Sequence, residues 1–137
     1  MTRKLSLDVG DKRIGVALSD PQGILASPLT IIHCVDESTD IAAIISIVSQ
    51  KQVGQIIVGL PRSMDGSIGK QAKKVKAFTQ NLCRHTDVPV EFRDERLSTV
   101  SAKRLIQAVN NKKPKNLVRH DAIAAALILQ GYLDEGL

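Results

Sequence analysis

The segment from Gln55 to Pro61 constrains the fold most, because it reads Gln-Ile-Ile-Val-Gly-Leu-Pro and is apolar at almost every position. A strand with one solvated face alternates apolar and polar residues, whereas a strand buried on both faces does not. Continuous apolar strands are typical of parallel sheets that helices cover on both sides. The sequence therefore predicts a central parallel strand that ends at Pro61.

On both sides of this strand, apolar residues recur at the intervals that are typical of amphipathic helices. In the segment 40–52, isoleucine and valine recur at intervals of three and four residues, and one of the polar residues 38–40 (Ser-Thr-Asp) can cap the first turn. After the turn signal Asp65-Gly66, residues 72–82 form one apolar helical face and lysines form another. A strand between two amphipathic helices favours parallel connections within one sheet.

The amino-terminal quarter has a different pattern. Apolar stretches at 4–10 and 14–18 are joined by Gly10-Asp11-Lys12, which is typical of a hairpin turn. A third stretch, 24–34, follows a Pro- and Gly-containing connection at 20–23. We therefore expect three antiparallel strands to precede the parallel ones.

The rest of the chain continues this alternation. Residues 88–92 indicate a strand, Ser98 or Thr99 can open a helix, residues 110–116 have loop character, and residues 122–129 are apolar on all sides, as in a buried helix. The order predicts an α/β, RNase H-like domain spanning residues 1–137. Its mixed five-stranded sheet would have three antiparallel strands followed by parallel strands, with helices on both faces.

Length and composition narrow the class of protein. The chain has 137 residues, 43% of them apolar, which suffices for one core. Its net charge of +5 favours an anionic partner such as nucleic acid. With only three aromatic residues, contacts to the phosphate backbone are a better hypothesis than base stacking. Cys34 and Cys83 lack metal-site spacing, and no apolar run resembles a signal or a membrane span, so a cytoplasmic location is expected.

Asp8 interrupts an apolar strand just before Gly10. Burying a lone carboxylate is costly, and a divalent metal would compensate it. A turn-forming aspartate that caps the hairpin amides is the equally weighted alternative.

Further acids follow other predicted elements. Asp94 and Glu95 come directly after a predicted strand, where they could bind metal. The alternative is that they form a solvated ion-pair cluster with the flanking arginines. Asp121 stands at the start of the last helix, where it could serve as a cap. The predicted topology lets Asp8, Asp121 and one acid of the 94–95 pair converge at the carboxyl edge of the sheet. Such acids could hold two metals that activate water and stabilise the leaving oxygen of a phosphodiester.

Basic residues near these acids could contact phosphates, although solvated surface charge is an equal alternative. The candidates are Lys12, Arg13, Lys70, Lys73, Lys74, Arg96, Lys112, Lys113 and Lys115.

Four motifs in register carry a resemblance to a known family. They stand at positions 8–17, 57–61 with 64–66, 94–99 and 121–125. With them the chain resembles the YqgF/RuvX family of pre-16S rRNA nucleases and Holliday-junction-resolvase-like proteins. The resemblance implies an RNase H-like fold and a metal-dependent nuclease, a hydrolase acting on ester bonds, that trims the 5′ end of the small-subunit rRNA precursor.

The resemblance also implies particular residues and partners. It assigns the catalytic and metal-binding acids to Asp8, Glu95 and Asp121, with Mg²⁺ or Mn²⁺ as the cofactor. The expected partners are pre-rRNA or branched DNA, with ribosomal particles as a further candidate, and the protein is expected to be a monomer or a homodimer. The sequence departs from the family pattern at Arg62-Ser63 and at His120, where an aliphatic residue is common.

Three rival interpretations stay open. An actin-like kinase or ATPase shares the Asp-x-Gly hairpin, but a chain of this length holds only one of its two domains. A non-catalytic RNA-binding module could retain the fold and the acids without turnover. A Holliday junction resolvase would cut branched DNA, and its paired cuts suit a symmetric dimer.

Overall fold

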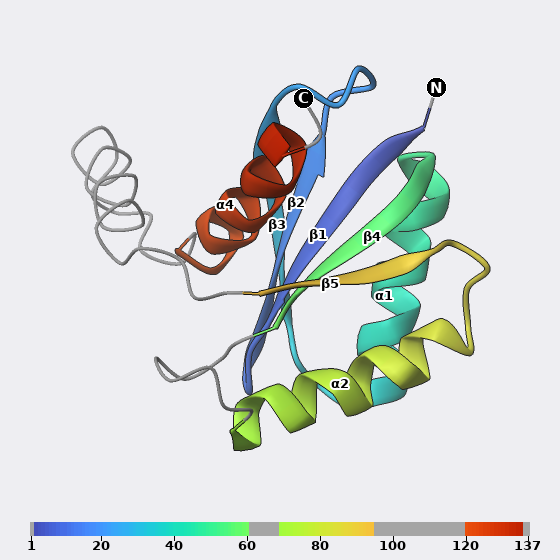
Figure 1. The fold of residues 1–137 in the computed structure, drawn as a ribbon. Helices are drawn as coiled ribbons and strands as arrows, with labels where there is room; N and C mark the ends of the chain where they lie inside the picture. Colours follow the sequence, from blue (N-terminus) through green and yellow to red (C-terminus); the bar gives the residue numbers. More distant parts are fainter. Residues whose placement is uncertain (1, 61–68, 95–119, 136–137) are drawn as a thin grey trace.

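One mixed sheet organises the part of the chain that is described, residues 2–60, 69–94 and 120–135 of a computed structural model. Its strands are β1 (Arg3–Val9), β2 (Arg13–Ser19), β3 (Ala26–His33), β4 (Val53–Leu60) and β5 (Val90–Asp94). The described helices are α1 (Glu37–Gln50), α2 (Lys70–Cys83) and α4 (His120–Glu135). The spatial order of the strands is β3-β2-β1-β4-β5, and Figure 1 shows α4 on one face of the sheet and α1 and α2 on the other.

The pairing of the strands confirms the predicted mixed sheet. β1 pairs with β2 and β2 with β3 in antiparallel fashion, whereas β1, β4 and β5 are parallel to one another. The carboxyl ends of β1, β4 and β5 consequently lie at one edge of the sheet. The loops and helices that follow these ends can place side chains close together.

Two apolar cores lie against the sheet, one on each face. In β1, Leu5 and Leu7 point into the core under α1 and α2. On the other face, Ile57 of β4 packs with residues of α4 such as Leu129. Both faces of β4 are therefore buried, as its continuous apolar sequence predicts.

The predicted N-cap of α1 is wrong, because none of residues 38–40 caps the helix. The cap is Asp36, an extended residue whose Oδ1 accepts a hydrogen bond from the Thr39 amide at 2.8 Å. Asp40 is instead buried, and its carboxylate accepts from the Val35 amide at 3.1 Å. Several residues of this polar run could cap a helix, but Asp40 lies inside the first turn of α1, where its carboxylate engages the Val35 amide.

The connection into β3 also differs from the expectation. The strand begins at Ala26 rather than at residue 24, because the Oδ1 atom of Asp20 accepts from the amides of Ile24 and Leu25 and holds them in a turn. The register between β2 and β3 shifts between Thr30 and Pro28, so Leu29 lies opposite no residue of β2. The strand expected at 88–92 is β5, two residues later.

The helix expected to open at Ser98 or Thr99 and the loop at 110–116 lie outside the described residues. None of the described helices is both long and apolar enough to cross a membrane.

Candidate nuclease site

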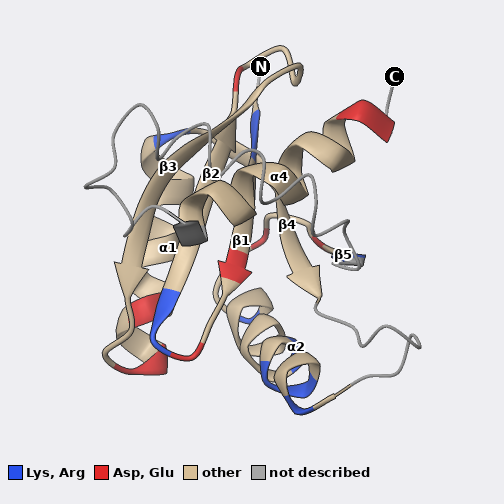
Figure 2. Cartoon of the chain, turned by 90° about the vertical axis from the view of Figure 1, so that its left-hand side faces the viewer, with Lys and Arg blue, Asp and Glu red and all other residues tan. Residues whose placement is uncertain are grey.

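Asp8 lies at the carboxyl end of β1, on the face of the sheet that α4 covers. It is half-buried. The face is set by alternation, because Leu7 points into the opposite core while Ser6 points toward α4. The hydroxyl of Ser6 is fully buried and donates to the carbonyl of Ala125 at 2.6 Å. Figure 2 shows an acidic position at the tip of β1.

Asp121 occupies the first turn of α4, four residues before Ala125. The helix runs in the direction opposite to β1, because its later residue Gln130 hydrogen-bonds Ala26 at the other end of the sheet. From the Ser6–Ala125 contact, Asp8 is two residues onward along the strand and Asp121 is one turn back along the helix. The backbone therefore brings Asp8 and Asp121 to the same end of the β1–α4 contact; the side chain of Asp121 is outside the described part of the structure.

Glu95 directly follows Asp94, the last residue of β5, and lies outside the described residues. β5 ends at the same edge of the sheet as β1, since Asp94 is in register with Leu60 at the end of β4. Among the side chains that are described, no three of the types that ligate metals gather at one place. The convergence of the three predicted acids therefore stays a prediction. The structure describes β1, β5 and α4, the elements that carry or precede these acids.

The hairpin between β1 and β2 presents its basic pair at the same edge. The amide of Gly10 donates to the carbonyl of Arg13 at 2.9 Å, and the Cys34 amide donates to the carbonyl of Lys12 at 2.9 Å. A Cβ at Gly10 would lie 2.8 Å from that Arg13 oxygen, so this close turn requires glycine. The backbone contacts fix the turn while the side chains of Lys12 and Arg13 are exposed.

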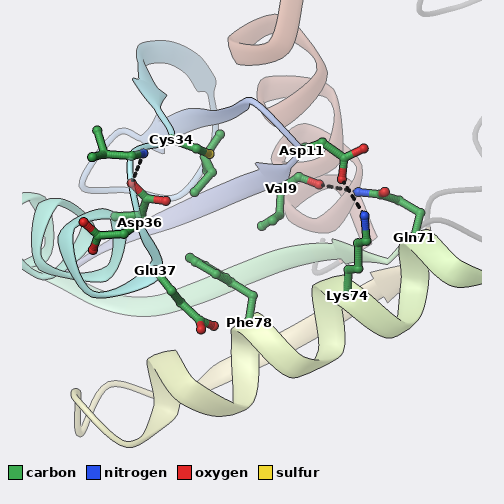
Figure 3. A pocket seen from close by; sticks show the side chains of 12 residues that line it. Val9, Asp11, Cys34, Asp36, Glu37, Gln71, Lys74 and Phe78 are labelled. Carbon is green, nitrogen blue, oxygen red and sulfur yellow. Dashed lines mark hydrogen bonds and ion pairs between the residues drawn. The ribbon is translucent and has the colours of Figure 1, made fainter.

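The start of α2 packs beside this hairpin (Figure 3). Gln71 donates from Nε2 to the carbonyl of Val9 at 3.2 Å, and Lys74 Nζ lies 3.3 Å from Asp11 Oδ1. Lys70 and Lys73 are exposed in the same helical turns. The structure thus brings the predicted basic positions of the hairpin and of α2 together. The other basic candidates, Arg96, Lys112, Lys113 and Lys115, lie outside the described residues.

A groove of about 370 Å³ lies between the hairpin, the start of α1 and α2 (Figure 3). It opens on the face opposite to Asp8, and three of its acids make structural contacts, namely Asp11, Asp36 and Asp40. Asp36 caps α1, and the hydrogen bond from the Thr39 amide holds its carboxyl pKa below the ordinary value. Burial, followed by the nearby Asp40 carboxylate, raises the pKa of the Cys34 thiol. Asp8 is not among the described residues that line this groove.

In the sequence Arg93 stands out only as one of the two arginines that flank the acids at 94–95, whereas in the structure it shares a row of the sheet with Asp8. Leu7 is in register with Val58, and Gly59 is in register with Arg93. Asp8, Gly59 and Arg93 are therefore successive neighbours across three parallel strands, on the face toward α4. Periodicity could not have found this residue, because its relation to Asp8 depends on the strand order.

Two solved structures with a similar fold are of a resolvase and of RuvC, each bound to Holliday junction DNA. The fowlpox virus resolvase in complex with Holliday junction DNA matches with a TM-score of 0.63, over 99% of both chains, at 14% identity. The Thermus thermophilus RuvC in complex with a Holliday junction matches with a TM-score of 0.63, over 99% of this chain and 97% of that chain, at 13% identity. At these identities the likeness shows the fold, which confirms the predicted RNase H-like class.

Relatives at higher identity are named as candidate pre-16S rRNA nucleases. A Roseiflexus protein is 46% identical over 96% of this chain and 94% of its own length. A protein of Desulforamulus reducens is 48% identical over 98% of each chain. The model of the RuvX family, described as Holliday junction resolvase, matches residues 2–135. Since this match and both relatives extend over nearly the whole chain, the protein belongs to the RuvX family.

Proposed function

We propose that the protein is a metal-dependent nuclease that hydrolyses phosphodiester bonds at the 5′ end of the small-subunit rRNA precursor. The observation that carries the proposal is the placement of Asp8, two residues beyond Ser6 on β1, at the end of the strand that faces the first turn of α4, which contains Asp121. The names of the relatives supply the substrate class.

The donor chemistry fits Mg²⁺ or Mn²⁺. Asp8, Asp121 and Glu95 would supply carboxylate oxygens, which are the ligands that these hard cations take in proteins. Asp8 is half-buried on β1, which pairs with β2 and β4 on its two sides, so the sheet holds its backbone in place. When bound, two such ions lower the pKa of a water and stabilise the leaving oxygen of the phosphodiester.

The protein's own residues would hold and orient the substrate. Lys12 and Arg13 are exposed on the turn that follows β1, and Lys70 and Lys73 are exposed on the neighbouring start of α2. These cations would contact phosphates on either side of the scissile bond and fix the register of the strand. Such contacts carry no sequence information, so structure in the RNA would select the cleavage site.

Resolution of four-way DNA junctions is a second candidate function. The description of the family as Holliday junction resolvase favours it. Two cuts related by a two-fold axis need two active sites, so this activity requires a homodimer. Cleavage of a four-way junction by a dimer and cleavage of rRNA by a monomer are distinguished by assaying both substrates at protein concentrations where the oligomeric state is known.

Substitution of Asp8 by asparagine tests the main proposal. Asp8→Asn keeps the shape of the side chain and removes its charge, so we expect cleavage of a 5′-extended 16S rRNA fragment to fall by on the order of 100-fold or more. Binding of the fragment should persist, because the basic surface is unchanged. Cleavage is measured at several Mg²⁺ and Mn²⁺ concentrations, and binding is measured without metal.

Asp134→Asn is the matched control, because Asp134 is an exposed acid near the other end of α4. It should retain full cleavage. Undiminished cleavage by Asp8→Asn removes Asp8 from the mechanism. A wild-type protein that binds the fragment but cuts it with neither ion is a non-catalytic RNA-binding module.

A further inference from the structure

Arg93 joins the edge strand β5 to the far half of α4. Its Nη1 atom lies 2.7 Å from Oε2 of Glu135, and its side chain is only 16% exposed although that of Glu135 is 66% exposed. The Nε atom of Arg93 is buried and has no hydrogen-bond acceptor among the described residues. Because the guanidinium is mostly buried, solvent screens this ion pair less than a pair between two exposed side chains.

Gly131 explains how the guanidinium reaches this position. A Cβ at Gly131 would lie 2.8 Å from Nη2 of Arg93 and 3.2 Å from both Cζ and Nε. The guanidinium therefore lies directly against the backbone of α4, where a side chain would displace it. Glycine weakens a helix interior relative to alanine, so its presence there calls for a packing reason, which Arg93 provides.

A second contact ties the same face of β5 to α4. The hydroxyl of Tyr132 donates to Oε2 of Glu91 at 2.8 Å, and Gln55 of β4 donates to the same oxygen at 2.7 Å. Glu91 and Arg93 are two residues apart and share this face of the strand. In the described sheet β5 pairs only with β4, so these side chains are its main link to the helix.

The link has a geometric consequence for the proposed active site. β5 ends one residue before Glu95, and Asp121 lies in the first turn of α4. Asp8 lies in the same row as Arg93, with only Gly59 between them. Because Glu95 directly follows β5, any shift of β5 relative to α4 would change the spacing of Glu95 from Asp121 and Asp8. A metal site tolerates such shifts poorly, because ligands must be held within about 0.5 Å of the productive geometry.

We propose that Arg93, seated on Gly131 and paired with Glu135, is a positioning residue that sets the spacing between the β5 end carrying Glu95 and the acids of β1 and α4. This inference rests on the proposed nuclease function. It assigns Arg93 no contact with substrate or metal.

The test compares Arg93→Ala, Gly131→Ala and the double variant. Calorimetry with Mn²⁺ alone measures metal binding, and cleavage of the rRNA fragment measures kcat and KM. We expect each single variant to weaken Mn²⁺ binding about 10-fold and to lower kcat, with KM changed less than about 2-fold. In the double variant Gly131→Ala should add no further loss, because the side chain that it displaces is already gone.

Glu135→Gln provides a milder variant in case the others fold poorly, because it removes only an exposed charge. It should weaken Mn²⁺ binding in the same direction by a smaller factor. Asp134→Asn, an adjacent exposed acid of the same helix, is the control and should bind Mn²⁺ as the wild type does. Thermal unfolding of every variant shows whether it is folded.

The outcomes separate the inference from the proposed function. Variants that lower the unfolding temperature but bind Mn²⁺ like the wild type show a merely structural link and overturn the inference. Independent, additive losses from Arg93→Ala and Gly131→Ala overturn it too. A wild-type protein that neither binds Mn²⁺ nor cleaves overturns the proposed function, and this inference with it.

Discussion

Tyr132 illustrates how single side chains of this protein acquire unusual properties from neighbours that are remote in sequence. Its hydroxyl donates to Glu91, and its ring is half-buried beside the core under α4. The hydrogen bond to the Glu91 carboxylate, followed by burial, raises the pKa of the phenol above its ordinary value of 10.0. The proton on Tyr132 is therefore held more tightly in the folded protein than in the unfolded chain.

A pH titration tests this arrangement directly, because Tyr132 is the only tyrosine in the sequence. The phenolate absorption should appear with a midpoint above that of free tyrosine, and the Glu91→Gln variant should have a lower midpoint. Since the folded-state pKa is raised, the stabilisation is fully present below pH 10 and is lost as the pH rises through the raised pKa. A wild-type midpoint at or below that of free tyrosine contradicts the contact with Glu91.

Some individual residues were predictable and others were not, for a common physical reason. Asp8 is a candidate because an acid within an apolar strand is a local anomaly, and its catalytic role stays a prediction. The N-cap of α1 was placed wrongly, because Asp36 and the polar residues 38–40 are comparable candidates until Asp40 binds the Val35 amide. The contact of Arg93 with Gly131 joins residues from different elements, and no local pattern reports it.

At the scale of elements, the start of α2 is the clearest basic surface in the described part of the chain. Lys70 and Lys73 are exposed, while Lys74 is engaged with Asp11. The helix follows β4, so its start lies at the carboxyl edge of the sheet and its end at the opposite edge. Basic side chains at the two ends of α2 should therefore contribute unequally to binding nucleic acid.

The salt dependence of binding measures this inequality. Replacing Lys70 and Lys73 by alanine should lower the slope of log affinity against log salt by about 1.4 to 1.8, since each phosphate contact contributes about 0.7 to 0.9. Replacing Lys51 and Arg84, which carry the same charge near the opposite edge, should leave the slope nearly unchanged. Equal changes in the two double variants would mean that net charge, and not this surface, governs binding.

The order of the described elements was predicted well, because each has a strong local signature. The continuous apolar sequence of β4 and the hairpin at Gly10 determined the sheet, and α1 and α2 followed from helical spacing. The limits of β3 were less predictable, since Ile24 and Leu25 favour a strand locally but are held in a turn by Asp20. For the proposed site, the sequence placed candidate acids at particular strand ends but did not predict how α4 is oriented over them.

At the scale of the whole molecule, one sheet separates two apolar cores. Ile44 of α1 is fully buried in the core on one face, and Leu129 of α4 is fully buried in the core on the other. Both cores use side chains of the same strands, because successive residues of β1 and β4 point to opposite faces. Loss of either core should therefore weaken the shared sheet and unfold the protein as one unit.

Thermal unfolding of Ile44→Ala and Leu129→Ala tests this coupling. Each substitution creates a buried cavity and should cost about 3 kcal/mol, which corresponds to a fall of roughly 10 °C in Tm for a chain of this length. We expect a single transition in both variants. Val35→Ala, at a residue that is 77% exposed, is the control and should change stability by less than about 0.5 kcal/mol. Two resolved transitions, each moved by one variant, would show that the cores unfold independently.

The irregular pairing of β3 bears on self-association. β3 lies at the edge of the described sheet, and Pro28 offers no amide to an incoming strand. The register shift at Leu29 further distorts this edge. Edges interrupted in this way are poor templates for strand addition, so they oppose aggregation into extended sheets. A second copy that cuts the opposite arm of a branched substrate is therefore not expected to dock by continuing the sheet at β3.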